Sequence, residues 1–323
     1  MRQLASVAML VSAAAVCAGA GAAGGRPNAS VRVGAIVSFP LPPGTEPQGI
    51  ASGPDGNVWF TDSATASTVG RITRTGHIRL FHVPTTGPLG GITAAPDGDM
   101  WFTEETHPFL DRITPSGKIT RYAVRHPVAG ITVGPDRALW LAETLSNRIG
   151  RFDVATHRVT EYPTPTLSSW PHGIHAGPDG NIWFAEARAA KVAKITPAGR
   201  ITEYPVSAHS DPRVIVRGPD GDMWFTEYGG DKIGRITARG RLAEFALPTP
   251  GAQPDGITRA GDGGLWFTEH GADRIGRISP TGAIREYPIA TPNAGPDKIV
   301  QGADGNLWFT EQSGDAIGRL QLR

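Results

Sequence analysis

The chain has 323 residues, a formal net charge of +1 and a single cysteine, Cys17. The near-neutral charge and the lack of a basic run exclude nucleic acid as an expected partner, and one cysteine excludes a disulfide framework. Glycine and proline are abundant, with 42 and 28 residues, but they recur at regular intervals, so they indicate turns and not disorder.

Residues 1–25 differ in composition from the rest of the chain. Arg2 precedes an apolar stretch from Leu4 to Ala18, and small Gly and Ala residues follow. This pattern is typical of a secretory signal peptide and is too short for a membrane anchor. We therefore expect a secreted or periplasmic protein without a membrane span. A short linker is expected over residues 26–34, and one domain over residues 35–323.

Within that domain a segment recurs seven times, beginning with Gly53-Pro-Asp-Gly-Asn-Val-Trp-Phe-Thr-Asp62. Its tryptophans are 39 to 43 residues apart, a period typical of propeller blades. They are Trp59, Trp101, Trp140, Trp183, Trp224, Trp266 and Trp308.

Each copy predicts four short strands. In the sixth copy, Gly256 to Thr258 and Leu265 to Thr268 flank an Asp-Gly turn, which favours a tight hairpin. Two further strands, Arg274 to Ile278 and Ala283 to Tyr287, flank a turn at Pro280 to Gly282. Stacking such blades around an axis buries the tryptophans and protects the sheet edges.

The two ends of the chain predict how the ring closes. The last copy stops after its third strand, Ile317 to Leu320, whereas Ala35 to Pro40 precedes the first copy and resembles a fourth strand. We therefore predict an all-β, seven-bladed β-propeller of four-stranded blades, in which the N-terminal strand closes the last blade. The alternative, an open solenoid, would leave both ends uncapped.

Two charged positions recur once in every blade. An acidic residue ends each Trp-Phe strand, and a basic residue lies in the third strand. Residues repeated sevenfold are expected to serve the architecture, and we expect these two to pair between strands. The acidic set is Asp62, Glu104, Glu143, Glu186, Glu227, Glu269 and Glu311, and the basic set is Arg71, Arg112, Arg151, Lys194, Arg235, Arg277 and Arg319.

Function is expected where the repeat breaks its symmetry. The residue after the proline that begins each first strand, or its equivalent, is small in blades 2 and 3 and polar elsewhere. Around the ring these residues are Gln48, Gly90, Ala129, His172, Arg213, Asp255 and Asp297. We expect His172, Arg213 and Gln48 to bind a small-molecule or cyclic peptide ligand at the mouth of the channel.

The hairpin geometry extends this polar arc. If each hairpin is centred on its Asp-Gly turn, Asp255 lies opposite His270 and Arg213 lies opposite Tyr228. Tyr228 then joins the substrate-binding group. Asp255 and His270 form a carboxylate-oriented imidazole, which is a candidate catalytic base.

The motifs Pro-x-Gly-Ile, Gly-Pro-Asp-Gly-x-x-Trp-Phe-Thr-Glu, Lys/Arg-Ile-Gly-Arg-Ile-Thr and Glu-Tyr-Pro, cycled seven times, resemble the virginiamycin B lyase (streptogramin lyase) family. The resemblance covers the whole mature chain and implies an enzyme that opens a cyclic depsipeptide by elimination. A base removes a proton α to a carbonyl, and a Mg²⁺ held by carboxylates stabilises the enolate-like charge.

This sequence matches only part of the site that the resemblance implies. Glu311 matches one metal-binding carboxylate, but Gly295 stands where the other is expected. Asp297 and Asp255 stand where the family has two histidines, so Asp297 would have to be the base. Either a water or Glu269 would have to compensate for Gly295, and the sequence does not decide between them.

Three functions stay open, and the sequence does not decide whether the protein is an enzyme. The first is an exported, Mg²⁺-dependent lyase that opens a cyclic depsipeptide or a similar ester. The second is a metal-dependent lactonase-type hydrolase, which product mass distinguishes because hydrolysis adds a water. The third is a non-catalytic binding propeller for an envelope, glycan or peptide ligand. In each case we expect a monomer.

Overall fold

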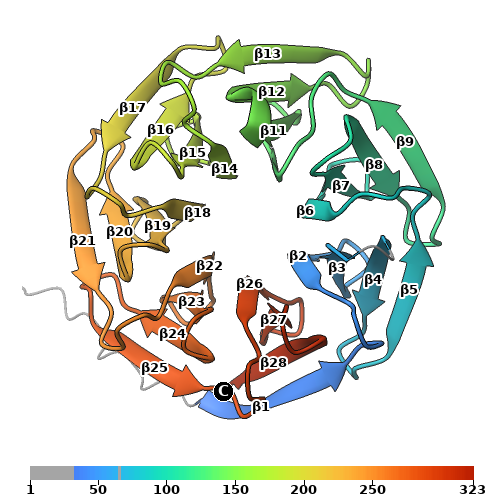
Figure 1. The fold of residues 1–323 in the computed structure, drawn as a ribbon, viewed down its shortest axis with the longest axis vertical. Coiled ribbons are helices and arrows are strands. Elements are labelled where there is room, and N and C mark those ends of the chain that lie inside the picture. The colour runs from blue at the N-terminus through green and yellow to red at the C-terminus, as the bar shows by residue number, and fades with distance from the viewer. Residues whose placement is uncertain (1–32, 65–66) are drawn as a thin grey trace, which may run out of the picture. The chain divides into compact units, whose positions relative to one another are not determined.

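Seven four-stranded antiparallel sheets surround a central axis in the computed structural model of the protein (Figure 1). The structure describes residues 33–64 and 67–323. The predicted signal peptide, and residues 26–32 of the predicted linker, lie outside the described residues. The described chain forms one compact unit, and the prediction of a seven-bladed β-propeller is confirmed.

The strands of each blade follow one another from the axis outward. The innermost strands are β2 (Pro47–Ser52), β6 (Leu89–Ala94), β10 (Gly130–Val133), β14 (Pro171–Ala176), β18 (Pro212–Arg217), β22 (Pro254–Arg259) and β26 (Pro296–Gln301). The second strands are β3 (Val58–Asp62), β7 (Met100–Glu104), β11 (Leu139–Glu143), β15 (Ile182–Glu186), β19 (Met223–Glu227), β23 (Leu265–Glu269) and β27 (Leu307–Glu311).

The outer half of each blade holds the remaining strands. The third strands are β4 (Thr68–Ile72), β8 (Phe109–Ile113), β12 (Arg148–Phe152), β16 (Lys191–Ile195), β20 (Lys232–Ile236), β24 (Arg274–Ile278) and β28 (Ala316–Leu322). The outermost strands are β5 (Ile78–His82), β9 (Ile119–Ala123), β13 (Val159–Pro163), β17 (Ile201–Pro205), β21 (Leu242–Ala246), β25 (Ile284–Pro288) and β1 (Val33–Pro40). A short 3-10 helix, η1 (Thr144–Ser146), connects β11 to β12.

Strand β1 closes the ring, as predicted. It begins at Val33, two residues before the expected start, and pairs antiparallel with β28, where Phe39 lies opposite Ile317. The last blade therefore contains both ends of the propeller (Figure 1). This pairing covers the edge that an open solenoid would expose.

The tryptophans are buried between blades. Trp224, for example, is fully buried and belongs to one core cluster with Ile257 and Leu265 of the next blade. Its Nε1–H donates to Asp220 Oδ1 at 3.0 Å in the turn between the first two strands. The guanidinium of Arg235 lies 5.5 Å from the centre of the Trp224 ring and 3.5 Å from Asp220.

This arrangement corrects one expectation from the sequence. In six of the seven blades the basic residue of the third strand pairs with the Asp of the turn. Arg277, for example, lies 2.8 Å from Asp262 and covers the ring of Trp266. It does not pair with the recurrent acidic residue, because the register places Arg277 opposite Trp266, three residues before Glu269. The two recurrent charges are therefore separated along the blade.

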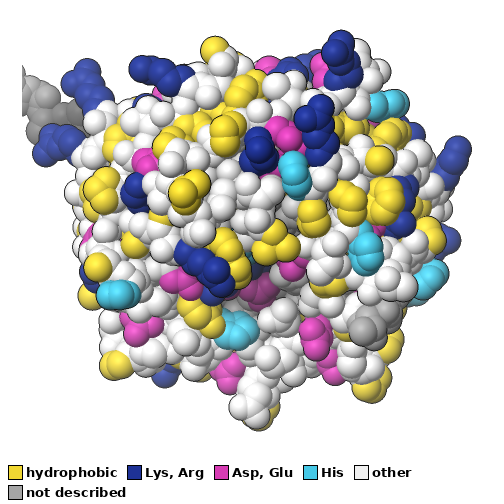
Figure 2. All heavy atoms as spheres, turned by 45° about the horizontal axis from the view of Figure 1, so that its top comes forward, with side chains coloured by type: hydrophobic (Ala, Val, Ile, Leu, Met, Phe, Trp, Pro, Cys, Tyr) yellow, Lys and Arg dark blue, Asp and Glu magenta, His cyan; other side chains and the backbone are white. Residues whose placement is uncertain are grey.

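The outer surface carries charges of both signs. On the face shown in Figure 2, acidic and basic side chains are interspersed, in keeping with the net charge of +1. Within residues 33–64 and 67–323, no helix has the length and apolar character needed to cross a membrane.

Candidate functional site

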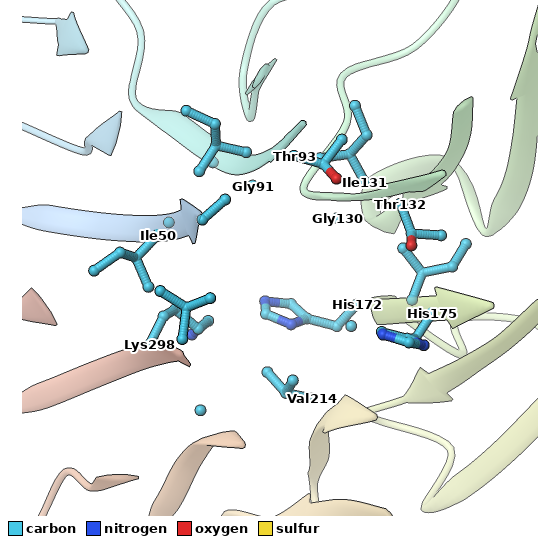
Figure 3. A pocket seen from close by; sticks show the side chains of 18 of the residues that line it. Ile50, Gly91, Thr93, Gly130, Ile131, Thr132, His172, His175, Val214 and Lys298 are labelled. Atoms are coloured by element: carbon cyan, nitrogen blue, oxygen red, sulfur yellow. The ribbon is translucent and has the colours of Figure 1, made fainter. Parts of the chain in front are cut away.

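The innermost strands enclose a central cavity of about 320 Å³. Apolar residues such as Ile50, Ile131 and Val214 form much of its wall, and His172 and Lys298 reach into it from different blades (Figure 3). Glycine is common along these strands because they approach one another backbone to backbone. A Cβ on Gly173 would lie 2.3 Å from the carbonyl oxygen of Arg213.

The residues after the strand-initial prolines are held by the neighbouring blade. The hydroxyl of Thr226 donates to the carbonyl oxygen of Asp255 at 2.6 Å, and that of Thr268 donates to the carbonyl oxygen of Asp297 at 2.6 Å. The threonine of the Trp-Phe-Thr motif therefore fixes the backbone at Asp255 and Asp297, whereas the blades before His172 and Arg213 have alanine at this position.

A β-bulge sets the direction of these side chains and corrects the predicted register. Pro254 pairs with Glu269, and the register shifts between Pro254 and Ile257, so Asp255 lies in the bulge. His270 instead donates its backbone N–H to Gln253. The predicted pairing of Asp255 with His270 is therefore wrong. The hairpin pairs Ile257 with Phe267, one residue earlier on the second strand than predicted, and the bulge then adds one residue on the first strand.

Lys298 is the centre of the site, and the sequence analysis missed it. Its Nζ lies 2.7 Å from Asp255 Oδ1 and 2.7 Å from Asp297 Oδ1. Both carboxylate side chains are only 7% exposed. Lys298 occupies the position that is glycine in most other blades, as at Gly173 and Gly256. That break in the Pro-x-Gly-Ile repeat was the signal that could have identified it.

The three charged groups titrate differently because of burial and their neighbours. Burial alone raises the pKa of Asp255, but the charges of Lys298 and Arg213 outweigh it and hold this pKa below its usual value. Burial raises the pKa of Asp297 to about 7, since the Asp255 carboxylate offsets part of the attraction of Lys298. Burial disfavours the ammonium of Lys298, but the two carboxylates raise its pKa above the usual range.

His172 is the neutral member of the site. Burial, followed by the charge of Lys298, lowers the pKa of His172 to about 4. Its Nδ1 is buried and has no hydrogen-bond partner among the described residues. The ring therefore presents a polar atom that a ligand could satisfy.

The other predicted ligand-binding residues surround this cluster. The guanidinium of Arg213 lies 4.3 Å from the centre of the Tyr228 ring and 2.8 Å from Asp211 Oδ2. Their side chains meet as predicted, although the backbone of Tyr228 pairs with Asp211. Gln48 lies in the cavity wall and donates from Nε2 to Glu105 Oε1 at 3.1 Å. Glu105 is a further carboxylate that sequence reasoning missed.

His270 lies beside this group without an Asp255 contact. Its ring centre is 6.2 Å from that of Tyr228, and its Nδ1 is buried without a hydrogen-bond partner in the described part of the chain. Asp255 is bonded to Lys298 instead. The structure therefore separates the two members of the predicted carboxylate–imidazole base.

The two predicted metal ligands lie inside their own blades. Oε1 of Glu311 accepts a hydrogen bond from Ser38 Oγ at 2.6 Å and lies 2.7 Å from where a Cβ on Gly318 would be. Oε1 of Glu269 lies 2.8 Å from the position that a Cβ on Gly276 would occupy. Both carboxylates therefore face the third strand, and neither residue lines the central cavity. Glycine at position 295 offers no side-chain ligand. This arrangement does not fit a Mg²⁺ at the channel mouth, and the Mg²⁺ expectation stays a prediction.

We predict that Glu269→Gln stabilises the protein under mildly alkaline conditions by about 1–3 kcal/mol. Burial, reinforced by Glu286, raises the pKa of Glu269 to about 8, and both its carboxylate oxygens lack hydrogen-bond partners among the described residues. The folded state then retains a proton that the unfolded state loses above pH ~4.3, so wild-type stability falls as the pH rises toward 8. The variant should show a flatter dependence of the melting temperature on pH.

A matched variant, Glu203→Gln, should behave in the opposite way, since Glu203 is paired with Lys191 at 2.6 Å and its pKa is lowered. An unchanged pH dependence in Glu269→Gln would contradict the expected titration. Added Mg²⁺ gives a further readout. If Glu269 bound this ion, Mg²⁺ would raise the melting temperature of the wild type and not of the variant.

Comparisons with known proteins agree with this architecture. The model of the virginiamycin B lyase family matches residues 28–212 and 168–323. A solved streptogramin B lyase is 35% identical, with a TM-score of 0.84 over 90% of this chain and 98% of that one. A virginiamycin B lyase from Staphylococcus aureus is 37% identical, with a TM-score of 0.84 over 90% of this chain and 99% of that one. A catalytically inactive variant of the latter, solved with quinupristin, is equally similar.

A search of curated proteins found no match. The family match nevertheless spans nearly the whole described chain, and the similarity to solved structures covers all seven blades. On these grounds the chain belongs to the virginiamycin B lyase family.

Proposed function

We propose that this propeller is an exported carbon–oxygen lyase that opens a cyclic depsipeptide or a similar ester by β-elimination. The observation that carries the proposal is the contact of 2.7 Å between the Lys298 ammonium and Asp297, a carboxylate whose pKa is raised to about 7. A proton acceptor with a pKa near neutral thus lies beside a fixed positive charge. Export rests on the composition of residues 1–25.

The proposed reaction uses these groups in two roles. Asp297 accepts the proton on the carbon α to a carbonyl, and that electron pair forms a double bond to the β-carbon. The bond between the β-carbon and the ester oxygen breaks, and the ester leaves as a carboxylate. Lys298 stabilises the enolate-like oxygen, and neutral His172 is available to hydrogen-bond a ligand carbonyl. The linear product has the mass of the substrate.

Family resemblance assigns the stabilisation of this charge to Mg²⁺, which acts as a Lewis acid. We propose that the Lys298 ammonium takes this role here, since it lies between Asp255 and Asp297 and lines the central cavity. An activity that survives a chelator and depends on Lys298 would support this substitution.

The shape of the surface supports a ligand larger than the central cavity. A second hollow of about 390 Å³ shares His172 and Arg213 with the site and extends to Trp170 and Arg188. The Arg188 guanidinium lies 3.4 Å from the centre of the Trp170 ring. A planar cation on an aromatic ring offers a flat surface to aromatic groups of a cyclic peptide.

Mass spectrometry on a type B streptogramin tests the proposal. The purified protein should give a linear product of unchanged mass, identified by a chromatographic shift and fragmentation, and Asp297→Asn should not. A mass gain of one water would establish a lactonase-type hydrolase instead. An untouched peptide would contradict activity on this substrate class.

A non-catalytic binding propeller is the second candidate. The observation in its favour is that Lys298 already neutralises and hydrogen-bonds both carboxylates, so the cluster is satisfied without a reaction to perform. A glycan or peptide ligand that raises the melting temperature and is recovered unchanged would favour this function.

A further inference from the structure

We propose that blade 3 carries a binding site for a divalent transition metal, formed by His126, Glu143 and Glu161. Glu143 ends β11, Glu161 lies in the outermost strand β13, and His126 lies in the connection from β9 to β10. The site is therefore separate from the innermost strands that line the central cavity, and the proposal does not depend on the proposed function.

The ligand atoms of the three residues already converge. His126 Nδ1 lies 3.1 Å from Glu143 Oε2 and 3.2 Å from Glu161 Oε1, and all three atoms are within 4.8 Å of one another. A tetrahedral Zn²⁺ with bonds of about 2.0–2.2 Å holds its ligand atoms roughly 3.3 Å apart. These separations accommodate such an ion with little movement of the side chains.

Burial makes an uncompensated charge at this place costly. The side chain of Glu143 is 0% exposed and that of Glu161 is 7% exposed, whereas His126 is 35% exposed. Oε1 of Glu143 is also buried without a hydrogen-bond partner among the described residues. Glu161 has one distant cation, since Nη1 of the exposed Arg125 lies 3.9 Å from its Oε2, but Glu143 forms no ion pair with Lys or Arg among the described residues. A cation between the two carboxylates would stabilise both of them, and the exposed edge of His126 leaves an entry path for one.

Other blades supply that cation permanently. In blade 4 the Nζ of Lys191 lies 2.6 Å from Glu203, and in blade 5 the Nζ of Lys232 lies 2.8 Å from Glu244. The equivalent residue in blade 3 is Arg148, and within the described chain it forms no ion pair with Glu143 or Glu161.

Blade 3 instead places His126 where blades 4 and 5 have Ser169 and Ser210, two residues before the first residue of the Pro-x-Gly-Ile motif, which is Val128 in blade 3. A fixed ammonium is thus replaced by a group that binds either a proton or a metal. The donor set also indicates which metal: imidazole nitrogen suits Zn²⁺ and its neighbours, whereas Mg²⁺ prefers an all-oxygen shell.

Zn²⁺ binding to the metal-stripped protein tests the site. Isothermal titration calorimetry and elemental analysis should give one Zn²⁺ per chain, which Mg²⁺ does not displace. His126→Ser, which installs the residue of blades 4 and 5, should weaken this binding about 100-fold or more. Glu161→Gln should weaken it as well. X-ray absorption of the wild-type complex should show nitrogen and oxygen ligands at about 2.0–2.2 Å.

His107→Ser is the matched control. His107 Nδ1 also lies near a buried carboxylate, 3.5 Å from Glu104, but that carboxylate is already bound to Arg121. Zn²⁺ binding should persist in this variant. Absence of stoichiometric Zn²⁺, or binding that survives His126→Ser, would overturn the proposal. So would a melting temperature that falls equally in His126→Ser with and without Zn²⁺, since His126 would then form only an ion pair.

Discussion

Lys298→Met is expected to destabilise the folded protein by about 3–5 kcal/mol at neutral pH. The substitution keeps an unbranched side chain of similar length but removes the ammonium that lies 2.7 Å from both Asp255 and Asp297. Two buried carboxylates then lie close together with only the more distant charge of Arg213 to offset them, which favours protonation of one of them in the folded state. Chemical denaturation followed by fluorescence of the buried tryptophans measures the change.

Two further variants separate this effect from a general loss of packing. The first is a triple variant that combines Asp255→Asn, Asp297→Asn and Lys298→Met. It removes all three charges and should recover most of the lost stability, because none of the three positions then carries a charge. Lys232→Met in blade 5 breaks a pair with Glu244 in which the lysine side chain is 30% exposed, so it should cost about 1 kcal/mol or less. Wild-type stability in Lys298→Met would refute the assignment of this ammonium as the counter-charge.

Asp297→Asn is expected to reduce ring opening by about 10²- to 10⁴-fold, the contribution typical of a general base. In the wild type, kcat/KM should rise with pH through about 7, since Asp297 must lose its proton to act and its pKa is raised to about 7. The amide has the shape of the carboxylate and leaves Lys298 paired with Asp255, so the variant should remain folded. Product formation measured by mass spectrometry across the pH range gives both quantities.

Asp255→Asn provides the complementary measurement. This variant removes the negative charge that raises the pKa of Asp297, and Lys298 then pairs with Asp297 only. The pKa of Asp297 should fall, so the rising limb of the pH profile should move to lower pH while activity persists. If Asp255 had only a structural role, the variant would lose activity and the rising limb would stay at the same pH. An active wild type whose profile is flat near neutral pH would show that Asp297 is not the base.

The repeat itself carried enough information to predict the propeller. Trp224 and Asp220 recur at fixed spacing because each blade needs a buried ring and a partner for its Nε1–H, and the basic residue equivalent to Arg235 lies over the ring in five of the blades. The strand resemblance of Ala35 to Pro40 predicted ring closure by β1 for the same reason, since an unpaired edge strand is unfavourable. The residues that meet these local requirements recur in each repeat, so the sequence alone reveals them.

The sequence by itself determined the all-β, seven-bladed architecture and identified Asp255 and Asp297 as positions where the repeat breaks its symmetry. Only the tertiary structure decided which groups meet there. The hairpin register and a bulge after Pro254 together separated Asp255 from His270, and Lys298, at a position that is glycine in most other blades, joined the two aspartates instead. The reason is physical: hydrophobic and turn periodicity specifies strands locally, whereas the charge balance of a buried site depends on side chains that different blades bring to one point.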